Sequence, residues 1–202
     1  MPERPKPPWR TITLPGRARI EIPARPMRIV AANSGAADIL SALIGVERFA
    51  AVPAQVDQYA AAQEFWKLHP EIPRFEHYRA EVLLGLRPDL VVTSAFQDPN
   101  TTALLKHQNI PVLSFENFET FDGIRAAIEN IGEAVGEEAR ARETRADFDA
   151  RLKRVAARLE GKKPLRVVYY SNYGSGFTIG AGGSQDEILR RAGGQNAAAE
   201  LG

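Results

Sequence analysis

Residues 80–94 read AEVLLGLRPDLVVTS, and this stretch indicates the fold. Its first half is typical of a helix of one or two turns. Arg87-Pro88-Asp89 then breaks the helix, because proline lacks a backbone N–H and disfavours the α conformation in the residue before it. Residues 90–93 follow as a continuous apolar run, typical of a strand buried on both faces of a parallel sheet. Helix, break and buried strand together predict one step of an alternating α/β domain.

The same alternation continues on both sides of this stretch. Further apolar strands are expected at residues 28–32, 49–52 and 111–115, with one helix after residue 34 and another at 100–108. Asn33 and Ser34 provide an N-cap for the first helix, since a side-chain oxygen accepts a hydrogen bond from the free amides of the first turn. The predicted fold class is therefore α/β with a largely parallel sheet.

Three other segments complete the expected organisation. Residues 11–14 and 19–22 alternate apolar and polar side chains around Pro15-Gly16, which predicts a β-hairpin. After the last helix of the first lobe, Gly136 interrupts the pattern, and a second helix runs on to Gly161. About 24 residues span ~36 Å, which suits a strut between two bodies. The expected regions are an extension and hairpin (1–27), an N-terminal α/β lobe (28–136), a linking helix (137–161) and the start of a second lobe (162–202).

That second lobe is expected to open with a strand at residues 165–170 and a helix at 184–192 capped by Ser184. One strand and one helix cannot cover both faces of a sheet, so bare strand edges and self-association are expected there.

Composition excludes several functions. The 202 residues carry 26 basic and 25 acidic side chains, which gives no positive patch for nucleic acid or an anionic membrane. The absence of cysteine excludes disulfides, thiolate metal sites and a cysteine nucleophile. The three histidines lack the close spacing of metal ligands, so no metal site and no catalytic residue are predicted. No signal peptide or membrane-spanning segment is visible in the sequence.

The ordered set of segments resembles the periplasmic binding proteins with a long linking helix, which serve ABC importers of ferric siderophores, haem and cobalamin. The resemblance rests on TITLPGRARIEIP, AANSGAADILSALIGVERFAAV, AEVLLGLRPDLVVTS, IENIGEAVGEEARA and LRVVYYSNYGSGFTIGAGGSQDEILRRAGGQNAA. It implies a two-lobed fold with a complete N-terminal lobe and a partial C-terminal lobe. It also implies a binding subunit, not an enzyme, that works in the periplasm or at the cell surface without a cofactor.

Ligands of such lobes collect where parallel strands end. Aromatic side chains recur in the loops at those positions, and aromatic walls suit planar or bulky metal complexes. The alternative for each residue is packing within its own lobe. The predicted ligand-binding residues are Asn33, Ser34, Tyr59, Phe75, Tyr78, Ser94, Phe96, Tyr173 and Phe177.

Glu81 corresponds, by the resemblance, to the surface glutamate that meets arginines on the membrane permease. Two other interpretations remain open at this point. The glycines of residues 174–183 follow a strand and precede a helix, as in a nucleotide-binding enzyme, although about a dozen residues separate the two elements. A sensor domain that keeps the fold without transport is the other alternative.

Overall fold

The computed structural model describes residues 7–14, 19–115, 120–172 and 174–200. These residues form two compact units. Unit 1 consists of residues 1–116 and 127–144, and unit 2 consists of residues 117–126 and 145–202. In the described parts of the chain, no helix combines the length and hydrophobicity needed to cross a bilayer.

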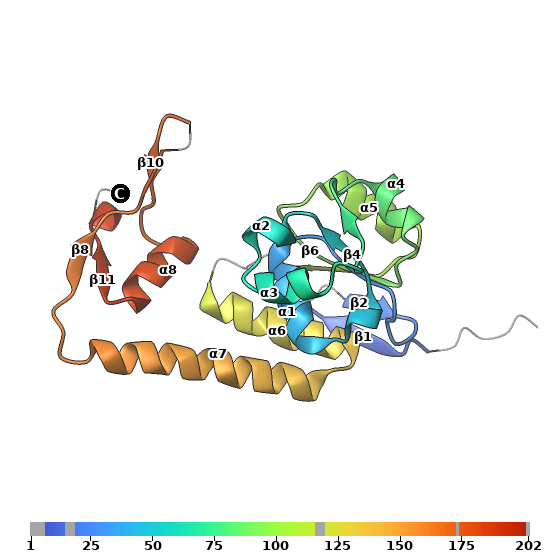
Figure 1. The fold of residues 1–202 in the computed structure, drawn as a ribbon, viewed down its shortest axis with the longest axis horizontal. Coiled ribbons are helices and arrows are strands. Elements are labelled where there is room, and N and C mark those ends of the chain that lie inside the picture. Colours follow the sequence, from blue (N-terminus) through green and yellow to red (C-terminus); the bar gives the residue numbers. More distant parts are fainter. Residues whose placement is uncertain (1–6, 15–18, 116–119, 173, 201–202) are drawn as a thin grey trace, which may run out of the picture. The chain divides into compact units, whose positions relative to one another are not determined.

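A five-stranded parallel sheet forms the centre of unit 1 (Figure 1). The strands are β3 (Ile29–Ala31), β4 (Phe49–Pro53), β5 (Arg74–Phe75), β6 (Leu90–Ser94) and β7 (Val112–Phe115), in the spatial order β5-β4-β3-β6-β7. Every residue of β3, β4 and β6 is buried, as expected for continuous apolar strands covered on both faces. The prediction of an α/β domain with a parallel sheet is confirmed.

Helices connect these strands. They are α1 (Ser34–Leu43), η1 (Val46–Arg48), α2 (Val56–Tyr59), α3 (Gln63–Leu68), α4 (Ala80–Gly85) and α5 (Pro99–His107), followed by α6 (Phe121–Val135) and the 22-residue α7 (Glu138–Leu159). The predicted hairpin is present as β1 (Arg10–Thr13) and β2 (Arg19–Ile22), paired antiparallel. Its turn at Pro15-Gly16 lies outside the described residues. The sequence did not predict α2, α3 or β5.

A buried arginine fixes the junction between α6 and α7 within unit 1. Arg48 is almost fully buried, and its guanidinium donates to the carbonyl oxygens of Pro26 (2.7 and 3.0 Å) and Val135 (2.7 Å) and to Glu137 Oε1 (2.9 Å). Burial lowers the pKa of Arg48, nearby Arg25 lowers it further, and Glu137 opposes both effects. Arg48 therefore ties the segment before β3 to the start of α7.

Gly136 allows the chain to turn between the two long helices. Its φ is +73°, a conformation that favours glycine, and a Cβ there would lie 2.9 Å from the Trp9 ring. The predicted break at this residue is confirmed.

Unit 2 has shorter strands. β8 (Leu165–Val167) pairs in parallel with β11 (Gly194–Asn196), and β9 (Tyr170–Ser171) pairs antiparallel with β10 (Phe177–Thr178). The helix α8 (Gly183–Arg191) precedes β11, and η2 (Ala197–Glu200) follows it. The prediction of one strand over residues 165–170 is wrong, because the backbone leaves β8 after Val167 and enters a separate hairpin.

The predicted cap of α8 is also wrong. Gly182 occupies the N-cap position with no side-chain cap, and Ser184 Oγ donates to its neighbour Gln185 instead (2.9 Å). Asp186 Oδ2 accepts a hydrogen bond from the Gly182 amide (3.0 Å), so a carboxylate inside the first turn satisfies this amide. The helix begins at Gly183, one residue before Ser184, so the N-cap position falls on Gly182, whose φ of +85° favours glycine.

Candidate functional site

The ends of β3 and β6 meet at the topological switch point of the sheet. From β3 the chain proceeds to β4 and β5 on one side, whereas β6 leads to β7 on the other. Crevices beyond the carboxyl ends of strands at such a point are where open α/β sheets bind ligands. Asn33 follows β3, and its Nδ2 donates to Ser94 Oγ at the end of β6 (3.2 Å). The structure thus brings together two of the predicted residues, which lie 61 positions apart in the sequence.

Asn33 also begins α1. Its Oδ1 accepts a hydrogen bond from the Ala36 amide (2.9 Å), which confirms the predicted N-cap. Oδ1 accepts the capping hydrogen bond and Nδ2 donates to Ser94, so both polar atoms of the Asn33 side chain are held in place. Ser34 is the first residue of α1 and is half-buried beside it.

Phe96 lies on a tightly held turn after β6. Before it, the Ala95 amide donates to the Phe115 carbonyl oxygen (2.9 Å), and after it, Gln97 Nε2 donates to the Ala32 carbonyl oxygen (3.0 Å). The Phe96 ring itself is 74% exposed. The turn thus holds a large apolar side chain in solvent next to the Asn33–Ser94 pair.

Asp98 completes this turn by capping α5. Its carboxylate accepts hydrogen bonds from the Thr101 hydroxyl (2.6 Å) and amide (2.8 Å) and from the Asn100 amide (3.3 Å). The Thr101 hydroxyl and amide lower the pKa of Asp98, so the cap stays charged. Asp98 was not among the predicted residues, although an Asp-Pro pair ahead of a helix is a recognisable start signal.

Tyr59, 75% exposed at the end of α2, is the second aromatic residue presented to solvent near the strand ends. Asp38 on α1 accepts hydrogen bonds from the amides of Ala61 (2.8 Å) and Ala62 (3.1 Å), just after Tyr59. Asp57, just before it, forms an ion pair with Arg74 (3.1 Å). The segment is therefore held on both sides of the tyrosine.

The loop after β5 has a mainly structural role. Phe75 is only 6% exposed and packs in the core cluster with Val30 and Leu83, so its ring does not reach solvent. The Arg74 guanidinium donates hydrogen bonds to the Asp57 carboxylate and to the carbonyl oxygens of Trp66, His69 and Ile72. Tyr78 is half-buried, and its hydroxyl lies 3.0 Å from Thr102 Oγ1. Of the two predicted ligand-binding residues in this segment, Phe75 is buried and Tyr78 is partly accessible.

Unit 2 contributes fewer described candidates. Phe177 lies on β10 and is 48% exposed, whereas Tyr173 lies outside the described residues. Within the parts of the chain that the structure describes, no group of three His, Asp or Glu side chains is arranged to hold a metal ion. His69, for example, pairs with Glu71 at 2.9 Å on the surface.

Glu81 is exposed in the first turn of α4. Among the described residues it has no hydrogen-bond or ion-pair partner, in contrast to Glu137 and Glu187. Its carboxylate is therefore free to meet a group on another molecule.

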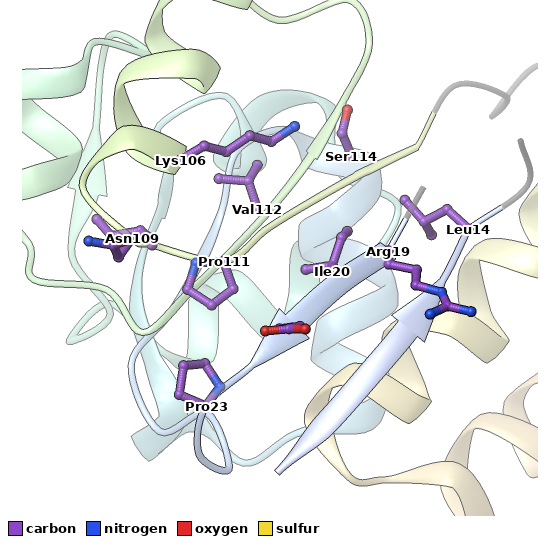
Figure 2. A pocket seen from close by; sticks show the side chains of 11 residues that line it. Leu14, Arg19, Ile20, Pro23, Lys106, Asn109, Pro111, Val112 and Ser114 are labelled. Carbon is purple, nitrogen blue, oxygen red and sulfur yellow. The ribbon is translucent and has the colours of Figure 1, made fainter. Parts of the chain in front are cut away.

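A hollow of about 520 Å³ lies elsewhere on unit 1, beside the edge strand β7. The hairpin residues Leu14, Ile20 and Pro23 form one wall, and Lys106, Asn109 and Pro111 form the other (Figure 2). None of the nine predicted ligand-binding residues lines it.

The glycine-rich loop of unit 2 does not form a phosphate cradle. Its residues build the β9–β10 hairpin between β8 and α8, and Gly176 lies against the Tyr170 ring, where a Cβ would come within 2.5 Å of the hydroxyl. The start of α8 already holds Asp186, whose pKa is lowered by hydrogen bonds from Asn196 and the Gly182 amide. A charged carboxylate at this place repels the phosphate that a nucleotide site needs. The structure thus contradicts the nucleotide-binding interpretation.

Comparison with known proteins supports the same conclusion. The sequence profile described as "Periplasmic binding protein" matches residues 29–202. The chain belongs to the periplasmic binding protein family. Proteins of this family bind substrates and are not enzymes, and membership implies a location outside the cytoplasm.

Individual relatives agree with this assignment. A cobalamin-binding protein of Halobacterium salinarum is 25% identical over 188 residues, which cover 90% of this chain and 49% of that protein. The apo structure of the haem-binding protein RhuT from Roseiflexus sp. RS-1 is 25% identical with a TM-score of 0.73, over 87% of this chain and 67% of that one. The haem-binding protein BhuT, in complex with two haems, is 28% identical with a TM-score of 0.68, over 84% and 66%.

These matches confirm the two-lobed periplasmic-binding-protein fold. The chain spans about half the length of the curated relatives and about two thirds of the solved ones. The part it shares with them includes the N-terminal lobe and only part of the C-terminal lobe.

Proposed function

We propose that this chain is the ligand-capturing part of an ABC importer for a metal complex, namely a ferric siderophore, haem or cobalamin. The observation that carries the proposal is the exposure of two large aromatic side chains after parallel strands: Phe96, two residues beyond the Asn33–Ser94 pair, and Tyr59, at the end of α2 after β4. Both side chains follow carboxyl ends of parallel strands, which is where open α/β lobes bind their ligands. They favour binding of an apolar, planar or bulky partner.

The Asn33–Ser94 pair supplies the polar element of such a site. A few fixed polar groups among apolar walls orient a ligand and give specificity. Ser94 keeps a hydroxyl proton to donate, so anionic or carbonyl oxygens of the ligand are suitable acceptors. The Tyr78 hydroxyl donates to Thr102, which itself donates to the Asp98 carbonyl oxygen, so Tyr78 can offer the ligand an acceptor oxygen and part of its ring. We place Phe177 and Tyr173 in the contribution of unit 2. Because Phe75 and Arg74 are engaged inside unit 1, we assign them a supporting role.

Ligand titration tests this proposal. Quenching of tryptophan and tyrosine fluorescence by haem, cobalamin and several ferric siderophores should reveal binding of at least one of them. Phe96→Ala should weaken that binding roughly tenfold, as expected for loss of one stacked ring. Leu68→Ala is the matched control. Leu68 is equally exposed (74%), but it is the last residue of α3, where the chain runs toward the start of β5. Binding of nicotinamide or adenine nucleotides in place of every metal complex would contradict the proposal.

We further propose that Glu81 docks the protein on its membrane permease. Its free carboxylate suits an arginine on a partner surface, and charge reversal there places like charges in contact. Glu81→Arg should reduce uptake in a transport assay more than Glu81→Ala does, with ligand affinity unchanged in both variants. Equal uptake by all three proteins would contradict the docking role.

A further inference from the structure

The hollow of about 520 Å³ in unit 1 is bordered by two strands, β2 and β7 (Figure 2). Successive side chains of a strand point to opposite faces of its sheet. The hollow is nevertheless lined by three consecutive residues of β2, from Arg19 to Glu21, and by the consecutive residues 109–112 that lead into β7. It therefore opens onto the backbone edges of these strands and not onto the face of a sheet.

The backbone of β7 has free hydrogen-bonding groups on this side. The carbonyl oxygens of Pro111 and Phe115 accept hydrogen bonds from amides of β6 and of the residue after it (3.0 and 2.9 Å). Because the direction of these groups alternates along a strand, the N–H and C=O groups of Val112 and Ser114 face away from β6. Within the described residues β7 pairs with β6 alone, and both Val112 and Ser114 line the hollow.

Strand β2 offers a second set of such groups. The Trp9 amide donates to the Pro23 carbonyl oxygen (3.3 Å), which makes these two residues a hydrogen-bonded pair at the open end of the hairpin. Such pairs alternate with non-hydrogen-bonded pairs in an antiparallel ladder, so the backbone groups of Ile20, opposite Ile12, point away from β1. Ile20 also lines the hollow. An extended chain in the hollow can thus meet β7 on one side and β2 on the other.

The charges around the hollow favour an acidic partner. Among its lining residues, Arg19 and Lys106 stand against a single acid, Glu21, and neither cation has a hydrogen-bond or ion-pair partner among the described residues. Lys106 points toward the side of the hollow where Ser114 lies (Figure 2). A carboxylate that enters on this side meets an unpaired ammonium group.

We propose that this hollow binds an extended segment of a partner protein, added as a strand between β7 and β2 with an acidic side chain beside Lys106. The added strand joins the two-stranded hairpin and the five-stranded sheet into one. Backbone hydrogen bonds give strand addition its affinity, and side-chain contacts give it specificity. Leu14, Ile20 and Val112 supply the apolar contacts. None of the nine predicted ligand-binding residues lines the hollow, so this site is separate from the one proposed for the metal complex.

Peptide selection tests the proposal. Phage-displayed heptapeptides selected on this chain should converge on alternating apolar residues with one Asp or Glu. A selected peptide should bind the Ser114→Pro variant roughly tenfold more weakly than wild type, because proline removes an outward N–H and leaves the hydrogen bonds to β6 in place. Ser114→Ala is the matched control, since it removes the hydroxyl but keeps this N–H, and it should retain the wild-type affinity.

Lys106→Gln tests the charge without altering a strand, because Lys106 is exposed on α5. Replacing the acid of the peptide with its amide should weaken binding to wild type several-fold and leave binding to Lys106→Gln unchanged. Failure of the selection, or a selected peptide that binds Ser114→Pro as tightly as wild type, would overturn the proposal. Either result would indicate that Lys106 and Pro23 only shield the edge of β7 from pairing.

Discussion

Unit 1 and unit 2 share an alternation of strands and helices but bury their strands to very different degrees. In unit 1, the central strands β3 and β6 each have a neighbour on both sides, and all their residues are buried. In the described part of unit 2, β8 pairs with β11 alone, and each residue of β8 is exposed. The two strands β6 (LVVTS) and β8 (LRV) begin with the same residue type. The number of neighbours, more than the side chains, therefore decides how much apolar surface a strand removes from water.

The largest expected effect comes from truncating equivalent leucines in the two units. Leu90 begins β6 and is fully buried, whereas Leu165 begins β8 and is 72% exposed. Leu90→Ala should lower the free energy of unfolding by about 3 kcal/mol, through lost burial and a cavity. Leu165→Ala should change it by less than about 0.5 kcal/mol. Urea unfolding followed by fluorescence of the buried Trp66 measures the first, and circular dichroism measures both. Similar losses would remove the contrast between the units.

An intermediate effect is expected from two arginines that each pair with a glutamate. Arg48 is buried and satisfies the carbonyl oxygens of Pro26 and Val135, which its removal would leave without donors. Arg48→Met should cost about 2 kcal/mol. Arg166 pairs with Glu200 on the surface of unit 2, and Arg166→Met should cost no more than about 0.5 kcal/mol. Thermal unfolding of both variants would decide the matter, and an Arg48→Met protein as stable as wild type would contradict the anchoring role.

The smallest expected effect is a loss of stability in unit 2 at low pH. The pKa of Asp186 is lowered from its ordinary value of 3.8 by hydrogen bonds from Asn196 and the Gly182 amide. Because the pKa is lower in the folded protein than in the unfolded chain, the carboxylate stabilises the fold at any pH above its pKa in the unfolded chain. This contribution is lost as the pH falls through its pKa in the folded protein. The α8–β11 region should therefore open on acidification below that value. Asp186→Asn should weaken the region at neutral pH but remove its further loss in acid.

Pepsin, which works in acid, can measure this opening. Cleavage between residues 165 and 200 should accelerate in wild type relative to the Asp186→Asn variant as the pH is lowered from ~4 to ~2. A constant ratio of the two rates over this range would show that Asp186 does not control the acid response.

Much of unit 1 was predictable from the sequence, because the signals for its elements lie in adjacent residues. Leu90, Val91 and Val92 form an apolar run directly after a proline break, so neighbouring residues alone predict that this strand is buried in a parallel sheet. The Asn33 cap is likewise a local signal. The meeting of Asn33 and Ser94 followed from the rule that parallel strands end at one edge of the sheet.

The elements that were missed depend on distant contacts. Strand β5 has only two residues, and its pairing with β4 (Val52↔Arg74) is set by the tertiary register. The sequence placed Phe75 in a binding loop, but the core cluster around Val30 and Leu83 draws its ring inward. The segment after Val167 remains apolar as far as Tyr170, so its period gave no sign that the strand stops. In unit 2, where the described strands have few neighbouring strands, the structure differs most from what the local sequence pattern predicts.

Hydrogen exchange, read peptide by peptide, tests the contrast between the two units most directly. We expect strong protection across residues 29–115 and weak protection across residues 165–200, because amides in short, exposed strand pairs open with little cost. Uniform protection of both units would show that unit 2 is as well supported as unit 1, and would contradict the account.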